Sequence, residues 1–518
     1  MLNRVIRWSL DNRLFVVAAA ALLLAYGAWV IVRLPIDVLP DLNRPTVTVM
    51  TEAPGLAPEE VETLVTFPVE SALNGAPGVV NLRSSSAPGL SIVYIQFDWG
   101  SDVFRDRQLV GERLQVAQES LPEGLTPVMT PVASIMGEVL LVGLSARDAS
   151  VSPMELRTTA DWVLRPRLLT IPGVAQVTVL GGEVRQLQVQ VDPARLRAAG
   201  LTLKDVEEAV AGSQANTTGG FLESRDEELL VRNIGRTADL EDLAATVVDY
   251  RDGVPVPLSS VADVRIAPPA KRGDAGVNAR PGVVLAITKQ PDADTVPLTR
   301  RLEAALAGME HAAPGVQITQ LFKQATFIEA AVGNVEAALR DGSILVLIVL
   351  ALFLANFRTT AITLTAIPLS FIVTALVFRA FDLSINTLTL GGLAVAIGEL
   401  VDDAVVDVEN VFRRLQENRH SPDPKPALEV IYQASSEVRG SIVFATILVV
   451  LVFIPLFALS GIEGRLFAPL GVAYIVSIVA SLAVSLTVTP ALCSYLLPRS
   501  RALDREEYGS RFVQRLKA

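Results

Sequence analysis

The chain has 518 residues, of which 51% are hydrophobic and 19% charged, and its formal net charge is −11. The hydrophobic share and a mean hydropathy of +0.44 exceed those of ordinary soluble domains, which favours a polytopic membrane protein. The negative charge argues against nucleic acid as a partner, and the single cysteine, Cys493, excludes an intrachain disulfide.

Six apolar runs are long enough, or nearly long enough, to cross a bilayer core of about 30 Å. In chain order they cover residues 14–32, 343–357, 361–378, about 387–408, 440–459 and 469–497. The first run follows three arginines, as in a signal peptide. It is longer than a signal h-region, however, and no small-x-small cleavage site closes it before Arg33. We therefore expect one retained helix, followed after a long interval by five more.

Positive charge predicts the orientation of these runs. Arginines and lysines concentrate ahead of the first run, between the second and third, between the fourth and fifth, and after the sixth. All these segments lie on one side if each run spans once, and the positive-inside rule makes that side the cytoplasm. The long segment 34–338 is then outside, and both termini are inside.

The first part of the outer segment alternates strand-like and helix-like stretches. We expect strands at 46–50, 79–84 and 91–97 and helices at 57–73 and 102–121. Pro58, followed by Glu59 and Glu60, is typical of a helix N-terminus. Two βαβ-type units with their helices on one sheet face would make a ferredoxin-like sandwich.

The same pattern recurs further along. The Pro77-Gly78 turn between a helix and a strand reappears as Pro172-Gly173. Ahead of the second turn we expect a strand at 138–144 and a helix at 153–170, and later a strand at 283–289 and a helix at 294–309. The matching order of elements predicts a duplicated outer domain.

A candidate insertion at about 183–275 separates the halves of the second copy. It begins with a strand at 186–191 and continues with a helix at 203–211. Thr202-x-x-Asp205 is a capping box ahead of that helix. We expect a flexible turn at 216–220, where two threonines precede two glycines.

These elements predict an α+β membrane protein with six transmembrane helices and a large duplicated outer domain. The expected parts are a tail with helix one, a first outer subdomain, a second subdomain in two halves around the insertion, helices two to six, and a basic tail. Their respective boundaries are 1–33, 34–135, 136–182 with 276–335, 183–275, 336–498 and 499–518.

The fourth run carries five carboxyls, which is unusual for a spanning helix: Glu399, Asp402, Asp403, Asp407 and Glu409. At 100° per residue they fall within an arc of about 160°. An ionised carboxylate at the centre of a spanning helix costs about 2.5–3.5 kcal/mol, so such groups usually face a bundle interior and mark an ion or proton path. Glu399, Asp407 and Glu409 can alternatively be solvated near the helix ends, whereas Asp402 and Asp403 sit deepest.

This order of parts resembles the N-terminal half of a resistance–nodulation–division (RND) efflux transporter, over nearly the whole chain. The motifs that carry the resemblance lie at 34–40, 53–62, 356–360, 367–370, 398–404, 408–410, 461–467 and 489–490. Within the superfamily the chain is most similar to the heavy-metal efflux branch, through the stretches 161–175, 181–182, 188–193 and 216–220.

The resemblance implies an inner-membrane protein of a bacterial cell with its large domain in the periplasm. It also implies two ferredoxin-like porter subdomains with a docking insertion, and a trimer that works with a periplasmic adaptor and an outer-membrane channel. Family members have about twice this length, so we expect a partner, either a C-terminal half or a second RND chain. The sequence is that of a split subunit, a truncated product or an excised fragment.

The resemblance further implies proton antiport. Asp402 and Asp403 are adjacent carboxyls in a low-dielectric setting, where burial and mutual repulsion oppose ionisation of both. We expect this pair to carry the proton, with Glu409 and Asp407 lining the inner access. No lysine lies between 343 and 412, so the cationic partner that the family provides would come from the other half.

The substrate stays open in the sequence. Relatives that export divalent cations often carry an aspartate where this chain has Ala396, and none of the six methionines, soft ligands for copper or silver, lies in a spanning helix after the first. His311 and His420 lie far apart in polar contexts, so no metal ligands are assigned. No nucleophilic catalytic arrangement and no cofactor site is evident, and we expect a secondary transporter, not an enzyme. The alternatives are an RND drug pump and a non-transporting remnant or assembly subunit.

Overall fold

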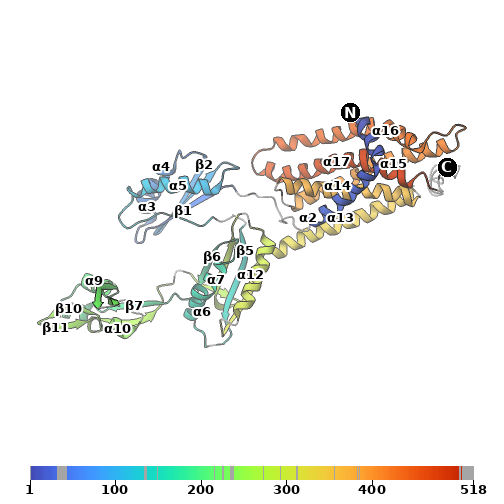
Figure 1. The fold of residues 1–518 in the computed structure, drawn as a ribbon. Coiled ribbons are helices and arrows are strands. Elements are labelled where there is room, and N and C mark those ends of the chain that lie inside the picture. Colours follow the sequence, from blue (N-terminus) through green and yellow to red (C-terminus); the bar gives the residue numbers. More distant parts are fainter. Residues whose placement is uncertain are drawn as a thin grey trace. The chain divides into compact units, whose positions relative to one another are not determined.

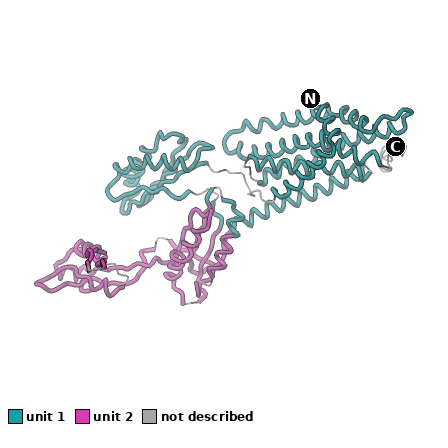
Figure 2. The backbone as a smooth tube through the Cα atoms, in the orientation of Figure 1, with its two compact units in different colours: residues 1–139, 290–300, 323–518 teal, residues 140–289, 301–322 magenta. Residues whose placement is uncertain are grey.

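The computed structural model describes residues 2–31, 42, 44–132, 137–148, 150–214, 216–224, 227–233, 239–271, 273–291, 293–310, 313–354, 356–381, 383, 385–500 and 503. The chain forms two compact units, drawn in different colours in Figure 2. One comprises Met1–Val139, Gln290–Arg300 and Lys323–Ala518, and the other Leu140–Lys289 and Arg301–Phe322. The motif at 34–40, His311, Met136 and the tail beyond 503 lie outside the described residues.

The first sheet has the strand order β2-β3-β1-β4, and its neighbouring strands are antiparallel. Its strands are β1 (Thr46–Glu52), β2 (Val79–Ala87), β3 (Leu90–Phe97) and β4 (Val128–Met129). The helical stretch between β1 and β2 consists of α3 (Pro58–Val61), the π-helix Glu62–Thr66 and α4 (Phe67–Leu73), and α5 (Val103–Gln118) lies between β3 and β4. Each strand and helix expected up to residue 121 is therefore confirmed.

Alternation of side chains along the strands builds the core of this sheet. Every second residue of β1 and β3 is buried, so one face is covered. Val47, Val49 and Ile95 from that face pack with Val69 of α4 and Val110 of α5. Both helices therefore cover the same face of the sheet, as Figure 1 shows.

The second sheet repeats the strand order of the first. It contains β5 (Glu138–Ala146), β6 (Val174–Gly181), β13 (Ala275–Val277), β14 (Arg280–Lys289) and β15 (Val316–Lys323). The order is β13-β14-β5-β15, with β6 also paired to β14, so β6-β14-β5-β15 corresponds to β2-β3-β1-β4. Its helices are α6 (Pro153–Thr159), the π-helix Ala160–Leu164, α7 (Arg165–Leu169) and α12 (Thr295–Met309).

A smaller set of elements lies in the chain between β6 and β13. It contains β7 (Gln186–Val191), α8 (Pro193–Ala198), α9 (Leu203–Ser213), β8 (Thr217–Ser224), β9 (Glu227–Asn233), α10 (Leu240–Ala244), β10 (Val247–Arg251), β11 (Val254–Pro257), α11 (Leu258–Val261) and β12 (Ala262–Ala267). Strand β7 pairs with β12, and a separate core around Val206, Leu243 and Leu258 holds the helices together.

The expected turn at 216–220 is wrong, because Thr217–Ser224 is strand β8 and pairs with β9. The pairing shifts register between Thr218 and Phe221, and Gly220 has φ +80°, a backbone conformation that suits glycine. The two glycines therefore form a bulge within a hairpin strand instead of a connecting turn.

Seven long helices and one short one make up the rest of the described chain. They are α1 (Leu2–Asp11), α2 (Arg13–Ile31), α13 (Gln324–Leu354), α14 (Phe357–Ala380), α15 (Thr387–Arg419), α16 (Ala427–Phe453), the 3₁₀ turn Ile454–Ala458 and α17 (Gly461–Leu496). Four stretches are long and apolar enough to cross a membrane: Arg13–Ile31, Phe357–Ala380, Ala427–Ala458 and Gly461–Leu496. The second and fourth expected runs fall in α13 and α15.

The expected membrane-spanning run 343–357 extends beyond the carboxyl-terminal end of helix α13. Helix α13 stops at Leu354, and Asn356 caps the next helix by accepting a hydrogen bond from the Arg358 backbone N–H at 3.1 Å. Phe357 is thus the first residue of α14. An asparagine side chain that satisfies a free N–H is a start signal for a helix, and here it separates two adjacent apolar helices.

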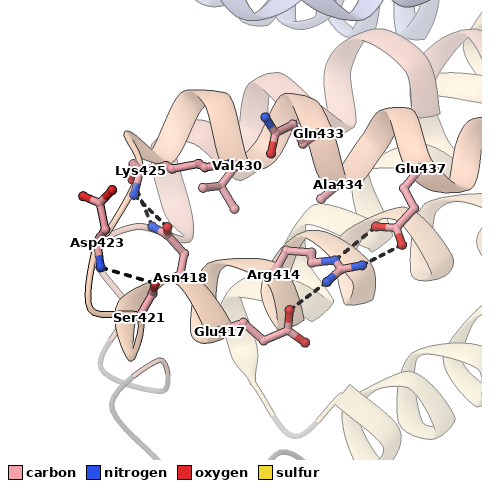
Figure 3. Close-up of a pocket in the computed structure, with 10 residues that line it drawn as sticks. All are labelled: Arg414, Glu417, Asn418, Ser421, Asp423, Lys425, Val430, Gln433, Ala434 and Glu437. Atoms are coloured by element: carbon pink, nitrogen blue, oxygen red, sulfur yellow. Dashed lines mark hydrogen bonds and ion pairs between the residues drawn. The ribbon is translucent and has the colours of Figure 1, made fainter.

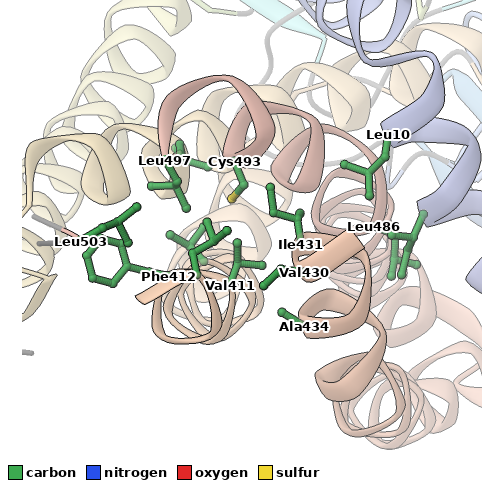
Figure 4. Close-up of a cluster of buried hydrophobic side chains, with 14 residues drawn as sticks. Leu10, Val411, Phe412, Val430, Ile431, Ala434, Leu486, Cys493, Leu497 and Leu503 are labelled. Carbon is green, nitrogen blue, oxygen red and sulfur yellow. The ribbon is translucent and has the colours of Figure 1, made fainter. Parts of the chain in front are cut away.

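A buried cluster joins α1, α15, α16 and α17. Figure 4 shows Leu10, Phe412, Ile431 and Cys493 among its members, each from a different one of these helices. Cys493 is fully buried and has a free thiol. One face of the carboxyl-terminal half of α15 is therefore covered by neighbouring helices.

Candidate functional site

Helix α15 begins with a capping box. The Asn386 side chain accepts a hydrogen bond from the Thr389 N–H at 2.9 Å, and the Thr389 hydroxyl accepts one from the Asn386 N–H at 2.8 Å. Both residues are buried, so the box satisfies polar groups that water does not reach. From there the helix continues for 33 residues and carries all five carboxyls.

Small residues let α15 approach α17 closely. A Cβ added at Gly392 would lie 2.6 Å from the Leu470 carbonyl oxygen of α17. One layer further in, Ala396 and Leu400 pack with Tyr474 and Ile478, and beyond that Ala404 packs with Val484 and Val488. The two helices therefore lie side by side along the acidic segment.

The five carboxyls differ steadily in exposure across their arc. Viewed down the helix, the order is Glu409, Asp402, Glu399, Asp403 and Asp407. The first three are exposed, Asp403 is half-buried, and Asp407 is 2% exposed. One edge of the acidic face is thus enclosed and the other is open. The interpretation of Asp407 as a solvated group near the helix end is wrong, because neighbouring helices cover it.

The adjacent residues Asp402 and Asp403 lie in different environments. The side chain of Asp402 is exposed, whereas Asp403 is half-buried. The Ser485 hydroxyl of α17 donates to the Asp403 backbone oxygen at 3.5 Å. Glu399 accepts a hydrogen bond from the Tyr474 hydroxyl at 3.2 Å. Neighbouring carboxyls that differ in solvation differ in how readily they lose a proton, which is what proton transfer needs.

Sequence reasoning missed the polar groups on α17. Tyr474 reaches Glu399, and the Ser481 hydroxyl donates to the Leu400 backbone oxygen at 2.9 Å. The signal was present in the sequence, since hydroxyl residues recur every four positions at Ser477, Ser481, Ser485 and Thr489. That spacing places them on one face of a helix.

Polar side chains fasten the other end of α15 to α16. The Asn410 amide donates to the Ala434 backbone oxygen at 2.9 Å, and Arg413 donates to the Asn410 side-chain oxygen at 2.8 Å. Arg414 bonds Glu437 through two nitrogens, at 2.7 and 3.1 Å, and Glu417 at 2.9 Å, as Figure 3 shows. Arg414, Glu417 and Glu437 are among the residues that line an open polar hollow beside the loop from α15 to α16.

The described part of the chain contains no group of three or more His, Cys, Asp and Glu side chains that could hold a metal ion. A metal site is accordingly not assigned to any residue. The candidate site on α15 is a set of carboxyls, which are groups that can take up and release protons.

Comparison with known proteins places the chain. The sequence model of the AcrB/AcrD/AcrF family matches residues 5–518. The cation efflux system protein CzcA of Alcaligenes sp. (strain CT14) is 33% identical over 503 residues, which covers 95% of this chain and 47% of that protein. The cation efflux system protein CusA of Escherichia coli (strain K12) is 33% identical over 506 residues, with 96% and 48% covered.

A solved structure is similar to this chain in fold and in sequence. The crystal structure of a heavy metal efflux pump (crystal form II) superposes with a TM-score of 0.84 at 28% identity and covers 95% of this chain and 49% of that one. The chain spans about half the length of the relatives it matches. On the family match over nearly its whole length, the chain belongs to the AcrB/AcrD/AcrF family of RND transporters, a family that includes the cation efflux proteins it resembles.

Proposed function

We propose that this chain is the N-terminal half of an inner-membrane, proton-driven RND efflux transporter that exports metal cations. The observation that carries the proposal is the acidic face of α15, with its enclosed edge packed against a polar face of α17. Carboxyls within a membrane helix raise the free energy of insertion, so they are rare there, and those that occur commonly belong to proton relays. The similar proteins CzcA and CusA are named as cation efflux proteins, which supports metal cations as the substrate class.

In this mechanism Asp402 and Asp403 carry the proton, and Glu409 and Asp407 line the access from the cytoplasm. One proton that crosses a potential of 100 mV releases about 2.3 kcal/mol, which is enough to bias a conformational cycle. Because the open edge of α15 carries Glu399, Asp402 and Glu409, a second set of helices would cover it and supply a cationic partner. That set can belong to the same polypeptide or to a second chain.

The proposed architecture has six membrane helices, namely α2, α13, α14, α15, α16 and α17. The two sheets of like strand order are ferredoxin-like porter subdomains, at 34–135 and at 136–182 with 276–335. The segment 183–275 is a docking insertion, 336–498 holds helices two to six, and 499–518 is a cytoplasmic tail. The protein works in a bacterial inner membrane as a trimer, with a periplasmic adaptor and an outer-membrane channel.

The test compares Asp402→Asn and Asp403→Asn with the parent protein in the complete transporter. Asp423→Asn, an exposed carboxyl in the loop after α15, is the matched control. In proteoliposomes with an imposed pH gradient, both α15 variants should lose proton-coupled transport while the control keeps it. If either variant still couples export to proton uptake, the assignment of the pair is wrong.

Growth inhibition separates the substrate classes. A host that lacks its own pumps should gain tolerance to cobalt, zinc, cadmium or copper salts when it carries the complete transporter. Tolerance to dyes and detergents without tolerance to metals would make the protein a drug pump. No gain for any compound, with the protein present in the membrane, would favour a non-transporting assembly subunit.

A further inference from the structure

Helix α17 presents a buried polar stripe to α15. Its members recur every four residues, and each is less than a tenth exposed: Ser477, Ser481, Ser485, Thr489 and Cys493. Ser477 shares a hydrogen bond with Thr374 of α14 at 3.0 Å, whereas Ser481 and Ser485 reach backbone oxygens of α15. Thr489 is the exception, since its buried hydroxyl has no hydrogen-bond partner.

The register between the helices places Thr489 at the level of Asp407. Ser481 meets Leu400, and Ser485 meets Asp403, so one further turn on both helices brings Thr489 to Asp407. Cys493, one further turn along α17, lies on the same face and packs in the same buried cluster as Val408, the residue after Asp407. The Asp407 carboxyl therefore points into the interface with this stripe.

Among the described residues, Asp407 has no hydrogen-bond partner either, and both of its carboxyl oxygens are buried. The Ser435 hydroxyl of α16 lies near this carboxyl and is also buried without a partner. Pro490 has no N–H, so the Leu486 carbonyl of α17 lacks its usual helical donor. In the described part of the chain, three side chains from three helices, Asp407, Ser435 and Thr489, thus have buried polar atoms without a partner near one level of the bundle.

The charges around Asp407 do not compensate it as an anion. Arg413 and Arg414, on the following turns of α15, are bonded to Asn410 and to Glu437. Among the described residues, the titratable group that the stripe of α17 brings near this level is the Cys493 thiol. A buried carboxylate without a partner is far more costly than a neutral carboxylic acid, which can donate one hydrogen bond and accept others.

We propose that Asp407, Ser435 and Thr489 form a second proton-binding site, bridged by water and separate from the Asp402–Asp403 pair. The site lies about 6 Å further along the helix axis than Asp403, given a rise of 1.5 Å per residue. Ser485, between the two levels, would connect them along α17. This inference rests on the proposed function for its direction of proton flow, but the site itself can be tested without transport.

The experiment is infrared difference spectroscopy of the full chain in lipid nanodiscs, titrated with potassium buffers. The parent protein should show a protonated-carboxyl band that persists above pH about 5, where ordinary aspartates and glutamates are ionised. Asp407→Asn should reduce that band and leave only the part that Asp402 and Asp403 contribute. Glu417→Gln, an exposed carboxyl on the same helix, should leave it in place.

A second variant guards against misfolding of the first. Thr489→Val keeps the side-chain shape but removes the hydroxyl, so the band should remain and shift to higher frequency as its carbonyl loses a hydrogen-bond donor. A band left unchanged by Asp407→Asn, or one that does not shift in Thr489→Val, would overturn the site. Loss of the band when sodium replaces potassium at constant pH would do so as well, because it would indicate a bound alkali cation.

The outcomes are distinguishable from those of the transport test. If Asp402→Asn and Asp403→Asn still support coupled export, the proposed function fails, whatever the spectrum of Asp407→Asn. If those variants abolish export but Asp407→Asn leaves the carboxyl band unchanged, the proposed function stands and the second site fails.

Discussion

At the scale of single residues, Asp205 shows how a local hydrogen-bond pattern makes stability depend on pH. Its carboxylate accepts hydrogen bonds from the backbone N–H and the hydroxyl of Thr202, at 2.7 and 2.8 Å, and its own N–H donates to the Thr202 hydroxyl at 3.3 Å. These bonds, above all the one from the Thr202 backbone, hold the pKa of Asp205 below its usual value. The capping box expected from the sequence is confirmed.

The depressed pKa of Asp205 determines how the stability of helix α9 should change with pH. An aspartate whose pKa is lower in the folded state stabilises that state above its unfolded pKa of about 3.9, and the contribution disappears as pH falls through the folded value. Asp205→Asn should therefore increase hydrogen exchange in Leu203–Ser213 at neutral pH and reduce the loss of protection in acid. Exchange measured by mass spectrometry at several pH values checks this.

Glu208→Gln is the control for this prediction, since Glu208 is exposed and pairs with Lys204 in the same helix. A surface ion pair of this kind contributes little, so the control should exchange like the parent chain. Equal acid sensitivity of the parent and of Asp205→Asn would contradict the role given to the capping box.

The acidic face of α15 shows how far the sequence predicts a site. Helical periodicity fixes the angles between the five carboxyls, so their common arc follows from the sequence alone. Which edge of the arc becomes enclosed depends on where α17 packs, and that is decided by residues such as Gly392 and Ala404 that carry no charge. Asp407 was therefore predicted as part of the site but not as its most buried member.

At the scale of elements, prolines account for the least predictable geometry. Both outer helical stretches contain a π-helix, Glu62–Thr66 and Ala160–Leu164, shortly before Pro68 and Pro166. A proline inside a helix lacks the N–H that would bond four residues back and clashes with that carbonyl, and a widened turn relieves both. The sequence predicts each helix and its length, but periodicity gives no signal for the wider turn.

The contact between α15 and α17 gives a prediction at this scale. Gly392→Ala would place a Cβ 2.6 Å from the Leu470 carbonyl oxygen and 3.1 Å from the Ala473 Cβ, so the helices must separate. Overpacking of this kind costs about 1–3 kcal/mol. The variant should therefore melt at a lower temperature in detergent micelles, monitored by circular dichroism.

Gly391→Ala is a matched control on the neighbouring residue. A Cβ there meets no atom within 4 Å, and alanine favours a helix over glycine by about 1 kcal/mol. The control should melt at the parent temperature or above it. A pair of variants with the same melting temperature would show that α15 and α17 do not need the close approach at Gly392.

At the scale of the whole molecule, the number of membrane crossings determines whether the acidic face of α15 lies within the bilayer. Hydropathy and length select α2, α14, α16 and α17. The other two proposed spans are α13, whose apolar part follows a polar first half, and α15, whose carboxyls lower its hydropathy. With six spans, the connection before α14 lies in the cytoplasm and the connection after it lies outside. With four spans, the two locations are exchanged.

Cysteine labelling separates the two topologies. The native thiol of Cys493 is fully buried, and Cys493→Ala provides a background without it. On this background, Phe357→Cys and Phe381→Cys place exposed thiols at the two ends of α14, since these side chains are 87% and 72% exposed. With six spans, 381 reacts with a membrane-impermeant maleimide in intact spheroplasts and 357 reacts only after permeabilisation. Four spans reverse that result.

Two further positions calibrate the assay, because both topologies place them alike. Ser460→Cys, just before α17, should react from outside, and Ser421→Cys, between α15 and α16, should react only from inside; both side chains are exposed. Labelling of 357 from outside, with these references correct, would leave α15 and its carboxyls out of the bilayer. The proposed proton relay would then lose its physical basis, since carboxyls in water cost nothing and need no function to explain them.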